Sequence, residues 1–419
     1  MKKVLITAYA VNPYKGSEDA MGWNMLLQAA RYQQVIAVTR KNNRPAIEKY
    51  IAQHPEIADL FSRLSFLYFD WPLWARWWKK GPLLSMIYYY GWQLTLAIWL
   101  KQKKLNVDIV HNLNFHNDWT PSFLWILGKP MVWGHVGHHP KIPREYILPV
   151  YGKRAYLKDR MLWLIKNISW NVDPFLAICK HKAAVIICMN TEAAKKLRLT
   201  KDYIIHPSVA ADTEIDIKSG RTDGVFRIVS AGRFVPLKGF DIAIRSFAIF
   251  YKALSPDFQN KVKLTLVGSG PCKALLKKIT ADEGIGRGVE FIEWIAKGEI
   301  KHIYQSASVF LFPSHEGAGM VIPEAMSYGL PIVCLKNCGP GDMLHPGSSL
   351  SVPYSTYNLT TAMLARKITK LFWDNDFMLK EKQLSELQYN ELFRWSVRGE
   401  MLEKVYQTAL KQDQLQNEK

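Results

Sequence analysis

Short apolar runs alternate with longer stretches of helical periodicity along most of the chain. The runs predict two series of strands, at 4–8, 34–39, 64–69, 107–111, 131–133 and 185–189, and then at 226–230, 262–267, 289–293, 309–312, 332–335 and 350–352. Strands that alternate with helices in this way form parallel sheets covered by helices on both faces. The pattern therefore predicts an α/β protein with two doubly wound, Rossmann-like sheets.

A change in composition separates the two series of strands. Residues 204–208 lead into the polar segment 211–224, which we interpret as a linker. The predicted domains are thus residues 1–208 and 209–388, followed by a helical stretch at 389–419. The chain is long enough for two domains of this size, each with its own core.

Residues 83–100 contain no charged side chain and have two interpretations. A stretch of this length is at the lower limit for a helix that spans a membrane. It also contains Ser, Gln, Thr and three Tyr, and it precedes the predicted strand 107–111. A spanning helix would interrupt a strand–helix–strand unit, so we expect a buried helix of the first domain.

The chain is strongly basic and rich in large aromatic residues. Its net charge is +19, and it contains 15 Trp and 19 Tyr. The positive charge implies an acidic partner, and the aromatic content favours a membrane interface over nucleic acid. The five cysteines are scattered and include no zinc-type pair, which predicts reduced thiols in a cytoplasmic protein.

Two glutamates, Glu316 and Glu324, lie eight positions apart with glycines between them. Glu316 follows a predicted buried strand, and Glu324 follows Pro323, which favours the first position of a helix. In an open α/β sheet such a strand–loop–helix junction lies at the carboxyl edge, where ligands bind. Two carboxylates around backbone amides such as those of Gly319 and Met320 suit a nucleotide sugar, which has hydroxyl groups at both ends and a diphosphate between them.

A second segment places Arg233 and Lys238 on one short loop after the predicted strand 226–230. A diphosphate leaving group carries concentrated negative charge while the bond to the sugar breaks. A guanidinium and an ammonium directed at those oxygens would stabilise that charge. The loop is therefore a candidate phosphate site.

The two segments together resemble the retaining GT-B glycosyltransferases of glycosyltransferase family four (glycosyl transferases group 1), in particular those of surface-polysaccharide biosynthesis. The resemblance implies two Rossmann-like domains facing each other across a cleft, with a C-terminal helix that packs back on the N-terminal, acceptor-side domain. It implies that Glu316 contacts the transferred sugar and that Glu324 holds the ribose. Arg233 and Lys238 would bind the donor phosphates, with no metal ion and no cofactor beyond the nucleotide sugar.

Further candidates lie in three loops after predicted strands. Gly16 lets the backbone approach a ligand, and Ser17 can cap the next helix. The Gly-Ser-Glu sequence resembles a subset of family-four enzymes in which this loop closes over the donor phosphates, although an ordinary glycine turn is an alternative. In the second domain, Gly268, Ser269 and Trp294 are expected to shape the base and phosphate pocket.

Histidines cluster after the fifth predicted strand. Many members of the resembled family carry one histidine here that contacts the transferred sugar, and His135 and His138 compete for that role. A metal site is the rival interpretation, but no carboxylate lies nearby in sequence. His111 and His116 lie at the end of another predicted strand. A place in the acceptor pocket and a role in the core or in a polar loop are equal alternatives for them.

Residues 70–80 interleave tryptophan with Lys and Arg. Trp rings prefer the headgroup level of a membrane, and the cations meet anionic lipid. This pattern predicts a peripheral contact with the inner face of the cytoplasmic membrane, where a lipid-linked acceptor would be presented. Tryptophans packed within a helical hairpin are the alternative.

The expected function is transfer of a sugar from a nucleotide-diphosphate sugar to a glycan or lipid-linked acceptor in bacterial exopolysaccharide, capsule or lipopolysaccharide assembly. Asp374-Asn375-Asp376 spells a metal-binding sequence of another transferase class, but it lies between helical stretches and is interpreted as a turn. The alternatives are another GT-B enzyme, such as a nucleotide-sugar epimerase, and a non-catalytic basic protein that binds polysaccharide or nucleic acid. No nucleic-acid partner is expected.

Overall fold

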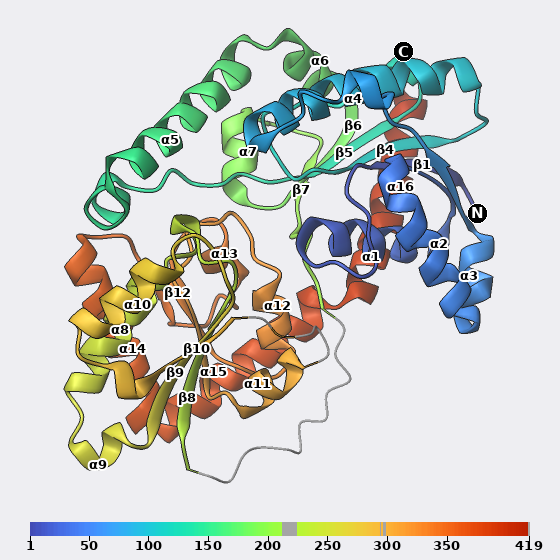
Figure 1. Cartoon of the computed structure of the whole chain (residues 1–419). Helices are drawn as coiled ribbons and strands as arrows, with labels where there is room; N and C mark the ends of the chain where they lie inside the picture. Colours follow the sequence, from blue (N-terminus) through green and yellow to red (C-terminus); the bar gives the residue numbers. More distant parts are fainter. Residues whose placement is uncertain (212–223, 294, 296–298, 418–419) are drawn as a thin grey trace. The chain divides into compact units, whose positions relative to one another are not determined.

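The computed structural model describes residues 1–211, 224–293, 295 and 299–417 (Figure 1). The chain forms two compact units. The N-terminal unit comprises Met1–His138, Leu164–Ser208 and Trp395–Lys419, and the C-terminal unit comprises His139–Trp163 and Val209–Arg394. The predicted linker, 211–224, lies almost entirely outside the described residues, as does Trp294.

The N-terminal unit contains seven parallel strands in the order β3-β2-β1-β4-β5-β6-β7. They are β1 (Lys3–Ala8), β2 (Gln34–Thr39), β3 (Leu64–Tyr68), β4 (Ile109–Asn114), β5 (Met131–Val136), β6 (Ala183–Cys188) and β7 (Tyr203–Ile205). The sequence predicts the first six of these. It assigns the residues of β7 to the approach to the linker, because three residues between polar segments give no usable periodicity.

Helices cover both faces of this sheet (Figure 1). One face carries α1 (Ser17–Tyr32) and α16 (Trp395–Asn417), which pack on each other, with α2 (Arg44–Gln53) and α3 (Ala58–Ser62) alongside. The other face carries α4 (Gly81–Lys103), α6 (Pro174–Lys182) and α7 (Thr191–Leu197). The short 3-10 turns are η1 (Lys41–Asn43), η2 (Pro55–Ile57), η3 (Leu73–Ala75) and η4 (Leu124–Leu127).

Helix α4 contains the uncharged stretch 83–100. Tyr88, Tyr89, Trp92 and Leu96 are buried against the sheet, so the expected buried helix of the first domain is confirmed. Within the described part of the chain, no helix is both long enough and apolar enough to cross a membrane.

The C-terminal unit has a six-stranded parallel sheet in the order β10-β9-β8-β11-β12-β13. The strands are β8 (Phe226–Ala231), β9 (Val262–Val267), β10 (Val289–Ile292), β11 (Val309–Phe312), β12 (Ile332–Leu335) and β13 (Ser351–Val352). All six are predicted from sequence. The central position of β8 and β11 is the switch point of a doubly wound sheet, beside which ligands bind.

Helices α8 (Phe240–Lys252), α10 (Lys273–Asp282) and α14 (Tyr357–Trp373) pack together on one face of this sheet. Right-handed crossovers place α11 (Ile300–Ser306) and α12 (Val321–Met326) on the other face, where α12 meets α15 (Asn375–Gln388). The remaining elements are α5 (Arg144–Val172), α9 (Pro256–Gln259), α13 (Pro340–Met343), η5 (Pro236–Lys238), η6 (Gly286–Gly288) and the π-helix η7 (Tyr389–Phe393).

Two expected helix starts are wrong. Ser17 has φ 56° and is itself the first residue of α1, so it does not cap the helix; Gly16 occupies the cap position without a side-chain bond. Pro323 is the third residue of α12, which starts at Val321 after Met320. Proline is also tolerated there, because the first-turn N–H groups have no intrahelical partner. Asp374 caps α15 by accepting a hydrogen bond from the Phe377 amide (2.9 Å).

Candidate donor site at the carboxyl edge of the second sheet

Glycines let the loops after β8, β9, β11 and β12 pack backbone against backbone. A Cβ on Gly268 would lie 1.9 Å from the Gly232 carbonyl oxygen, and one on Gly239 would lie 2.1 Å from that of Pro313. A Cβ on Gly339 would lie 2.0 Å from the carbonyl oxygen of Glu316. Since real Cβ atoms do not approach so closely, no other residue fits these positions without movement of the loops. The result is one continuous backbone surface at the carboxyl edge of the sheet.

At the carboxyl edge of the second sheet, the side chains of Lys238 and Glu316 lie in contact. Lys238 Nζ donates to Glu316 Oε2 over 2.7 Å, and the two side chains are only 16% and 15% exposed. Lys238 Nζ also lies 5.1 Å from the centre of the Phe312 ring. The residues are 78 positions apart in sequence, and the sheet makes them neighbours because β8 and β11 pair directly.

Arg233 and the Gly319–Met320 segment lie in the same pair of loops. Arg233 follows β8 and is exposed. Gly319 lies over Phe312, and a Cβ there would be 3.0 Å from the ring and 3.7 Å from Glu316 Oε2. Met320 directly precedes α12, and its carbonyl oxygen accepts from the Glu324 amide (3.3 Å), while that of Gly319 accepts from the Ile322 amide (3.1 Å).

Glu324 lies in the first turn of α12, near two tyrosines. Burial raises the pKa of Tyr304 well above its usual value, and the negative charge of Glu324 adds to the effect. Burial and then Glu324 also raise the pKa of Tyr328. Both phenols therefore stay protonated beside the carboxylate.

Several residues that position the Glu316 loop carry no signal in the sequence. Asn337 Nδ2 donates to the Ser314 carbonyl oxygen (2.8 Å), and His139 Nδ1 accepts from the Gly317 amide (3.1 Å). His315 Nδ1 lies 2.7 Å from the Tyr354 hydroxyl group, and burial lowers the pKa of His315 to about 3. These partners come from separate parts of the chain, so spacing alone could not have identified them.

Gly268 and Ser269 follow β9 directly, next to the β8 loop. The Phe234 amide donates to the Ser269 carbonyl oxygen (2.9 Å), and the Gly268 amide donates to Ile292 (2.8 Å). These bonds place the β9 loop beside Arg233. Trp294, the third expected residue of this pocket, lies outside the described residues.

The two competing histidines of the N-terminal unit have different surroundings. His138 Nδ1 lies 2.7 Å from Asp118 Oδ2, with both side chains buried. His135 is buried, and among the described residues neither of its ring nitrogens has a hydrogen-bond partner. Burial lowers the pKa of His135 well below its usual value, so the ring is neutral at pH 7.

Further titratable groups surround His135. The ring of His116 lies 6.3 Å away and that of His206 lies 6.4 Å away. His116 Nδ1 is 3.1 Å from Glu18 Oε1 in α1, a carboxylate near the histidines that sequence spacing does not reveal. Within the described residues, however, no group of three His, Cys, Asp or Glu side chains is arranged to hold a metal ion.

His111 and His206 anchor α16 to the first sheet. His111 Nδ1 lies 2.8 Å from the Tyr406 hydroxyl group, and Nε2 lies 2.6 Å from the Gly134 carbonyl oxygen. Arg398, fully buried, places Nη1 3.2 Å from His206 Nε2. Burial lowers the pKa of Arg398 to about 9. His111 is therefore a core histidine, one of the two alternatives left open by the sequence.

Gly16 lies in the loop after β1 and is exposed, and a Cβ there would meet nothing within 4 Å. The residue is therefore open to a ligand, but the geometry does not require glycine. Its role at the donor phosphates stays a prediction.

The tryptophan-rich segment divides into a packed part and an exposed part. Trp71 and Trp78 lie against Tyr88 of α4, and Trp71 Nε1 donates to Thr95 Oγ1 (2.7 Å). Trp74 and Trp77, in contrast, are 79% and 75% exposed. The packed part fits the alternative of tryptophans packed within the fold, and the membrane contact of the exposed part stays a prediction.

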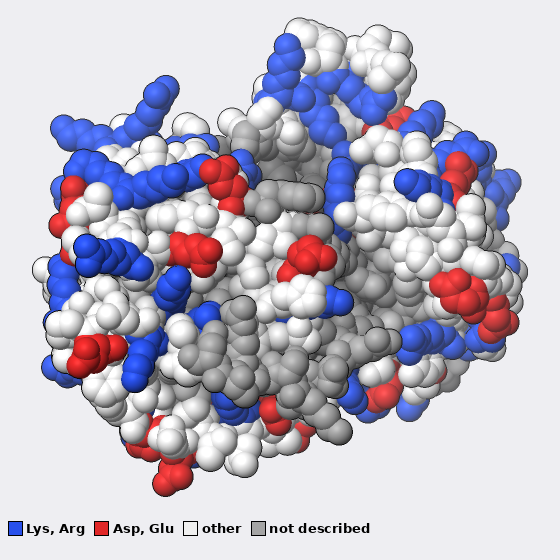
Figure 2. Space-filling model, turned by 60° about the horizontal axis from the view of Figure 1, so that its bottom comes forward, with Lys and Arg blue, Asp and Glu red and all other residues white. Residues whose placement is uncertain are grey.

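Figure 2 shows how the charged residues are distributed on one face of the molecule. Lys and Arg side chains are scattered over this face, several of them in groups, among acidic and uncharged residues. A nucleic-acid-binding surface typically gathers cations into a stripe or patch. The face shown has no such continuous stripe among its described residues.

The C-terminal unit is similar in sequence to a known family. Residues 211–389 match the family described as Glycosyl transferases group 1. The two Rossmann-like sheets match GT-B glycosyltransferase structures, which confirms the predicted fold class.

Two curated proteins are similar in sequence to parts of this chain. An uncharacterized glycosyltransferase of Haemophilus influenzae is 36% identical over 27% of this chain and 30% of its own length. The amylovoran biosynthesis glycosyltransferase AmsK of Erwinia amylovora is 27% identical over 64% of this chain and 63% of its own. The chain thus spans less than two thirds of either relative. Anabaena HepE, solved with UDP and glucose, has the same fold (TM-score 0.62, 15% identity, 97% of this chain and 100% of that chain).

Proposed function

We propose that the protein is a retaining, metal-independent glycosyltransferase that takes its sugar from a nucleotide-diphosphate sugar. The observation that carries the proposal is the Lys238–Glu316 contact at the glycine-built edge of the unit that matches the Glycosyl transferases group 1 family. A cation and a carboxylate within one hydrogen bond can hold the two sides of a sugar–phosphate bond. The likeness to AmsK and to HepE, solved with UDP and glucose, supports a nucleotide-sugar donor and a role in surface-polysaccharide assembly.

In this proposal each part of the edge binds one part of the donor. Arg233, Lys238 and the amides of Gly319 and Met320 hold the diphosphate. Gly268 and Ser269 contact the phosphates or base, Glu324 binds the ribose hydroxyls, and Glu316 binds the sugar. Gly16, which belongs to the N-terminal unit and not to this edge, is proposed to contact the donor phosphates. Lys238 exchanges its bond to Glu316 for a bond to phosphate when the donor enters. The site then places positive charge where the leaving group becomes more negative.

The transfer step follows from this arrangement. The acceptor hydroxyl oxygen bonds to the anomeric carbon from the face on which the bond to the diphosphate breaks, and the departing phosphate oxygen takes the hydroxyl proton. The configuration is thereby retained. We propose His135 rather than His138 as the histidine near the sugar, because His138 is bonded to Asp118 while His135 has no hydrogen-bond partner among the described residues. An inverted product would contradict the mechanism.

A thermal-shift screen against UDP-, GDP-, ADP- and CMP-sugars tests donor binding. We expect one nucleotide class to raise the melting temperature by a few degrees, because a ligand that binds only the folded state stabilises it. Glu324→Ala and Lys238→Ala should each abolish the shift. Lys252→Ala, which removes a similar ion pair to Glu283 at the other end of α8, is the matched control and should keep it.

No shift with any donor, in protein shown to be folded, would favour the non-catalytic binding protein. A shift that survives in both Glu324→Ala and Lys238→Ala would place the nucleotide elsewhere. Conversion of the donor into a different nucleotide sugar without any acceptor would point instead to an epimerase-type reaction.

We further propose a cytoplasmic protein that works at the membrane surface. Leu73, Trp74 and Trp77 are exposed beside several cations, and the end of α5 exposes Leu164, Ile168 and Val172, which are spaced four residues apart. Exposed apolar groups next to Lys and Arg bind the interface of an anionic bilayer. A lipid-linked acceptor would be reached from there.

Changing both Trp74 and Trp77 to serine should weaken binding to vesicles that contain phosphatidylglycerol by tenfold or more. Burial of one large apolar side chain is worth about 1.5–3 kcal/mol, and both rings are now largely exposed. Co-sedimentation measures the effect. Trp373→Ser, at a 55% exposed position in the C-terminal unit, is the control; an equal loss in that variant would contradict a specific contact.

A further inference from the structure

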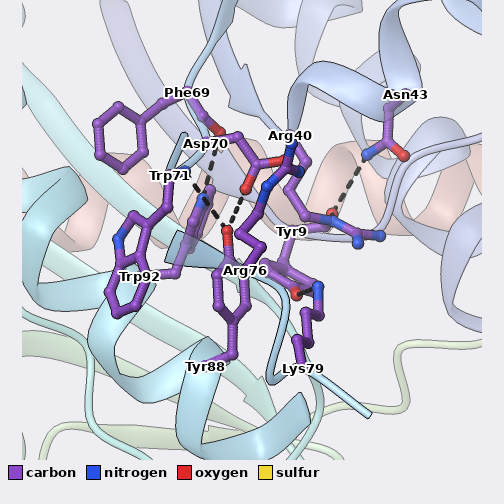
Figure 3. A network of polar contacts seen from close by, with 10 residues as sticks. All are labelled: Tyr9, Arg40, Asn43, Phe69, Asp70, Trp71, Arg76, Lys79, Tyr88 and Trp92. Atoms are coloured by element: carbon purple, nitrogen blue, oxygen red, sulfur yellow. Dashed lines mark hydrogen bonds and ion pairs between the residues drawn. The ribbon is translucent and has the colours of Figure 1, made fainter. Parts of the chain in front are cut away.

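A group of cations lies at the carboxyl edge of the first sheet (Figure 3). Arg40 follows β2, and Arg76 and Lys79 lie in the segment between β3 and α4. They surround Tyr9, which follows β1. Arg40 Cζ lies 4.0 Å from the centre of the Tyr9 ring, and Lys79 Nζ lies 2.7 Å from the Tyr9 hydroxyl oxygen.

The framework that holds these cations is rigid. Arg40 Nε donates to the Tyr9 carbonyl oxygen (2.9 Å), which also accepts from Asn43 Nδ2 (3.2 Å). The Tyr9 ring packs edge-on against Tyr89 and Trp92 of α4. The backbone and rings thus hold Tyr9 and Arg40 in place, and an ordered cation loses less entropy when a ligand binds.

The cations exceed the carboxylates around them. Asp70, buried, accepts from Arg76 Nη1 (2.7 Å) and from the Tyr88 hydroxyl group, and so balances one charge. Asp19 is the other nearby carboxylate, and it faces Lys15 as well as Arg40. Arg76 Nε is buried without a hydrogen-bond partner among the described residues.

Lys79 shows the consequence of this imbalance. Burial and then the positive charges of Arg40 and Arg76 together lower the pKa of Lys79 to about 8, against the opposing effect of Asp70. Its ammonium group lies 4.1 Å from the centre of the Tyr88 ring. A half-buried lysine among like charges costs stability, and such arrangements gather at binding sites.

We propose that Arg40, Arg76 and Lys79 bind a phosphate group of a lipid-linked acceptor. A phosphate supplies the missing negative charge and enough oxygens for three donors. The segment that carries Arg76 and Lys79 also exposes Leu73, Trp74 and Trp77, an apolar surface suited to the lipid chain of the same molecule. The carboxyl edge of a doubly wound sheet is where such ligands bind. The inference rests on the proposed function and names its acceptor class.

Isothermal titration calorimetry with geranyl diphosphate, a soluble lipid diphosphate, tests the site, and geraniol serves as the uncharged control. We expect the diphosphate to bind and geraniol to bind at least tenfold more weakly. The double variant Arg40→Gln/Lys79→Gln should weaken diphosphate binding tenfold or more, while Arg40→Lys/Lys79→Arg, which keeps both charges, should restore most of it. Arg76 is left in place because Asp70 needs it.

Lys80→Gln is the matched control, because Lys80 is an exposed neighbour of Lys79 and its loss changes the net charge equally. The affinity of the Lys80→Gln variant for geranyl diphosphate should stay within twofold of that of the unchanged protein. Unaltered affinity in the double variant would overturn the proposal. Loss of binding only in Lys238→Gln would also overturn it, by placing the diphosphate in the donor loop.

Vesicles of phosphatidylglycerol distinguish an acceptor phosphate from lipid headgroups in general. If the double variant loses vesicle binding but keeps geranyl diphosphate binding, the cations serve headgroups and the proposal fails. The thermal-shift screen with nucleotide sugars is independent of this result, so failure of the acceptor site and failure of the donor site remain distinguishable.

Discussion

Replacing Lys238 with alanine should lower the rate constant of sugar transfer by about 100- to 1,000-fold, the usual effect of removing one group that stabilises transition-state charge. The ammonium group lies in a loop made of close backbone contacts, 16% exposed, with Glu316 as its present partner. In the proposed reaction it neutralises charge that grows on the leaving diphosphate. The Michaelis constant for the donor should rise less than the rate constant falls, because that charge is largest in the transition state.

The measurement is release of nucleoside diphosphate, with the donor identified by the thermal-shift screen and a membrane extract as acceptor source. Lys238→Arg keeps the charge and should recover part of the rate. Lys252→Ala, which removes an ion pair of similar length on α8, should leave the rate unchanged. If Lys238→Ala transfers sugar as fast as the unchanged protein, the β8 loop is not the phosphate site.

The melting temperature distinguishes a loss of catalysis in Lys238→Ala from misfolding of the variant. Loss of a partly exposed ion pair costs on the order of 1 kcal/mol or less, so the variant should melt within a few degrees of the unchanged protein. Glu316→Gln removes the same pair from the other side. If only loss of the pair mattered, the two variants would lose activity equally; in the proposed mechanism they differ, because Glu316 binds the sugar and Lys238 the phosphate.

The strands that build the donor edge could be predicted because their signal is local. The runs at β11 and β12 are continuous, apolar and bounded by turn residues, as buried parallel strands are. Lys238 and Glu316 lie in the loops that follow β8 and β11. Their contact then follows from the pairing of adjacent strands in a doubly wound sheet.

The partners of the site could not be predicted, because each depends on packing between distant segments. Tyr354 reaches His315, Asn337 reaches Ser314, and Arg398 reaches His206 from a helix almost 200 residues later. Single polar residues carry no periodicity, so only the folded arrangement reveals them. Helix starts were also missed, since Ser17 and Pro323 have propensities that suit more than one position near a helix end.

The N-terminal unit should lose stability steeply as the pH falls below about 6.5, the usual pKa of histidine. Burial lowers the pKa of His111 to about 4 and that of His206 to about 3. It also lowers the pKa of His135 well below its usual value. The unfolded chain therefore binds protons between pH 6.5 and pH 4 that the folded unit excludes. Stability is fully present above pH 6.5 and is lost as the pH decreases.

The size of the effect follows from proton linkage. Each such histidine costs about 1.4 kcal/mol for every pH unit below its unfolded pKa, so three of them cost about 6 kcal/mol between pH 7 and pH 5. That amount is comparable to the whole stability of many domains. Arg398 sharpens the effect, because a charged His206 would lie 3.2 Å from a buried guanidinium. The unit should then unfold near pH 5 at room temperature.

Urea unfolding at pH 7, 6 and 5, followed by tryptophan fluorescence, measures the loss. His206→Gln removes one titrating ring and keeps a polar side chain next to Arg398, so the pH dependence should fall by about one third. His181→Gln, at an exposed position at the end of α6, should leave it unchanged. An unfolding midpoint that stays constant from pH 7 to pH 5 would show that these rings accept protons in the folded protein. The close packing around His111, His135 and His206 would then have to open in acid.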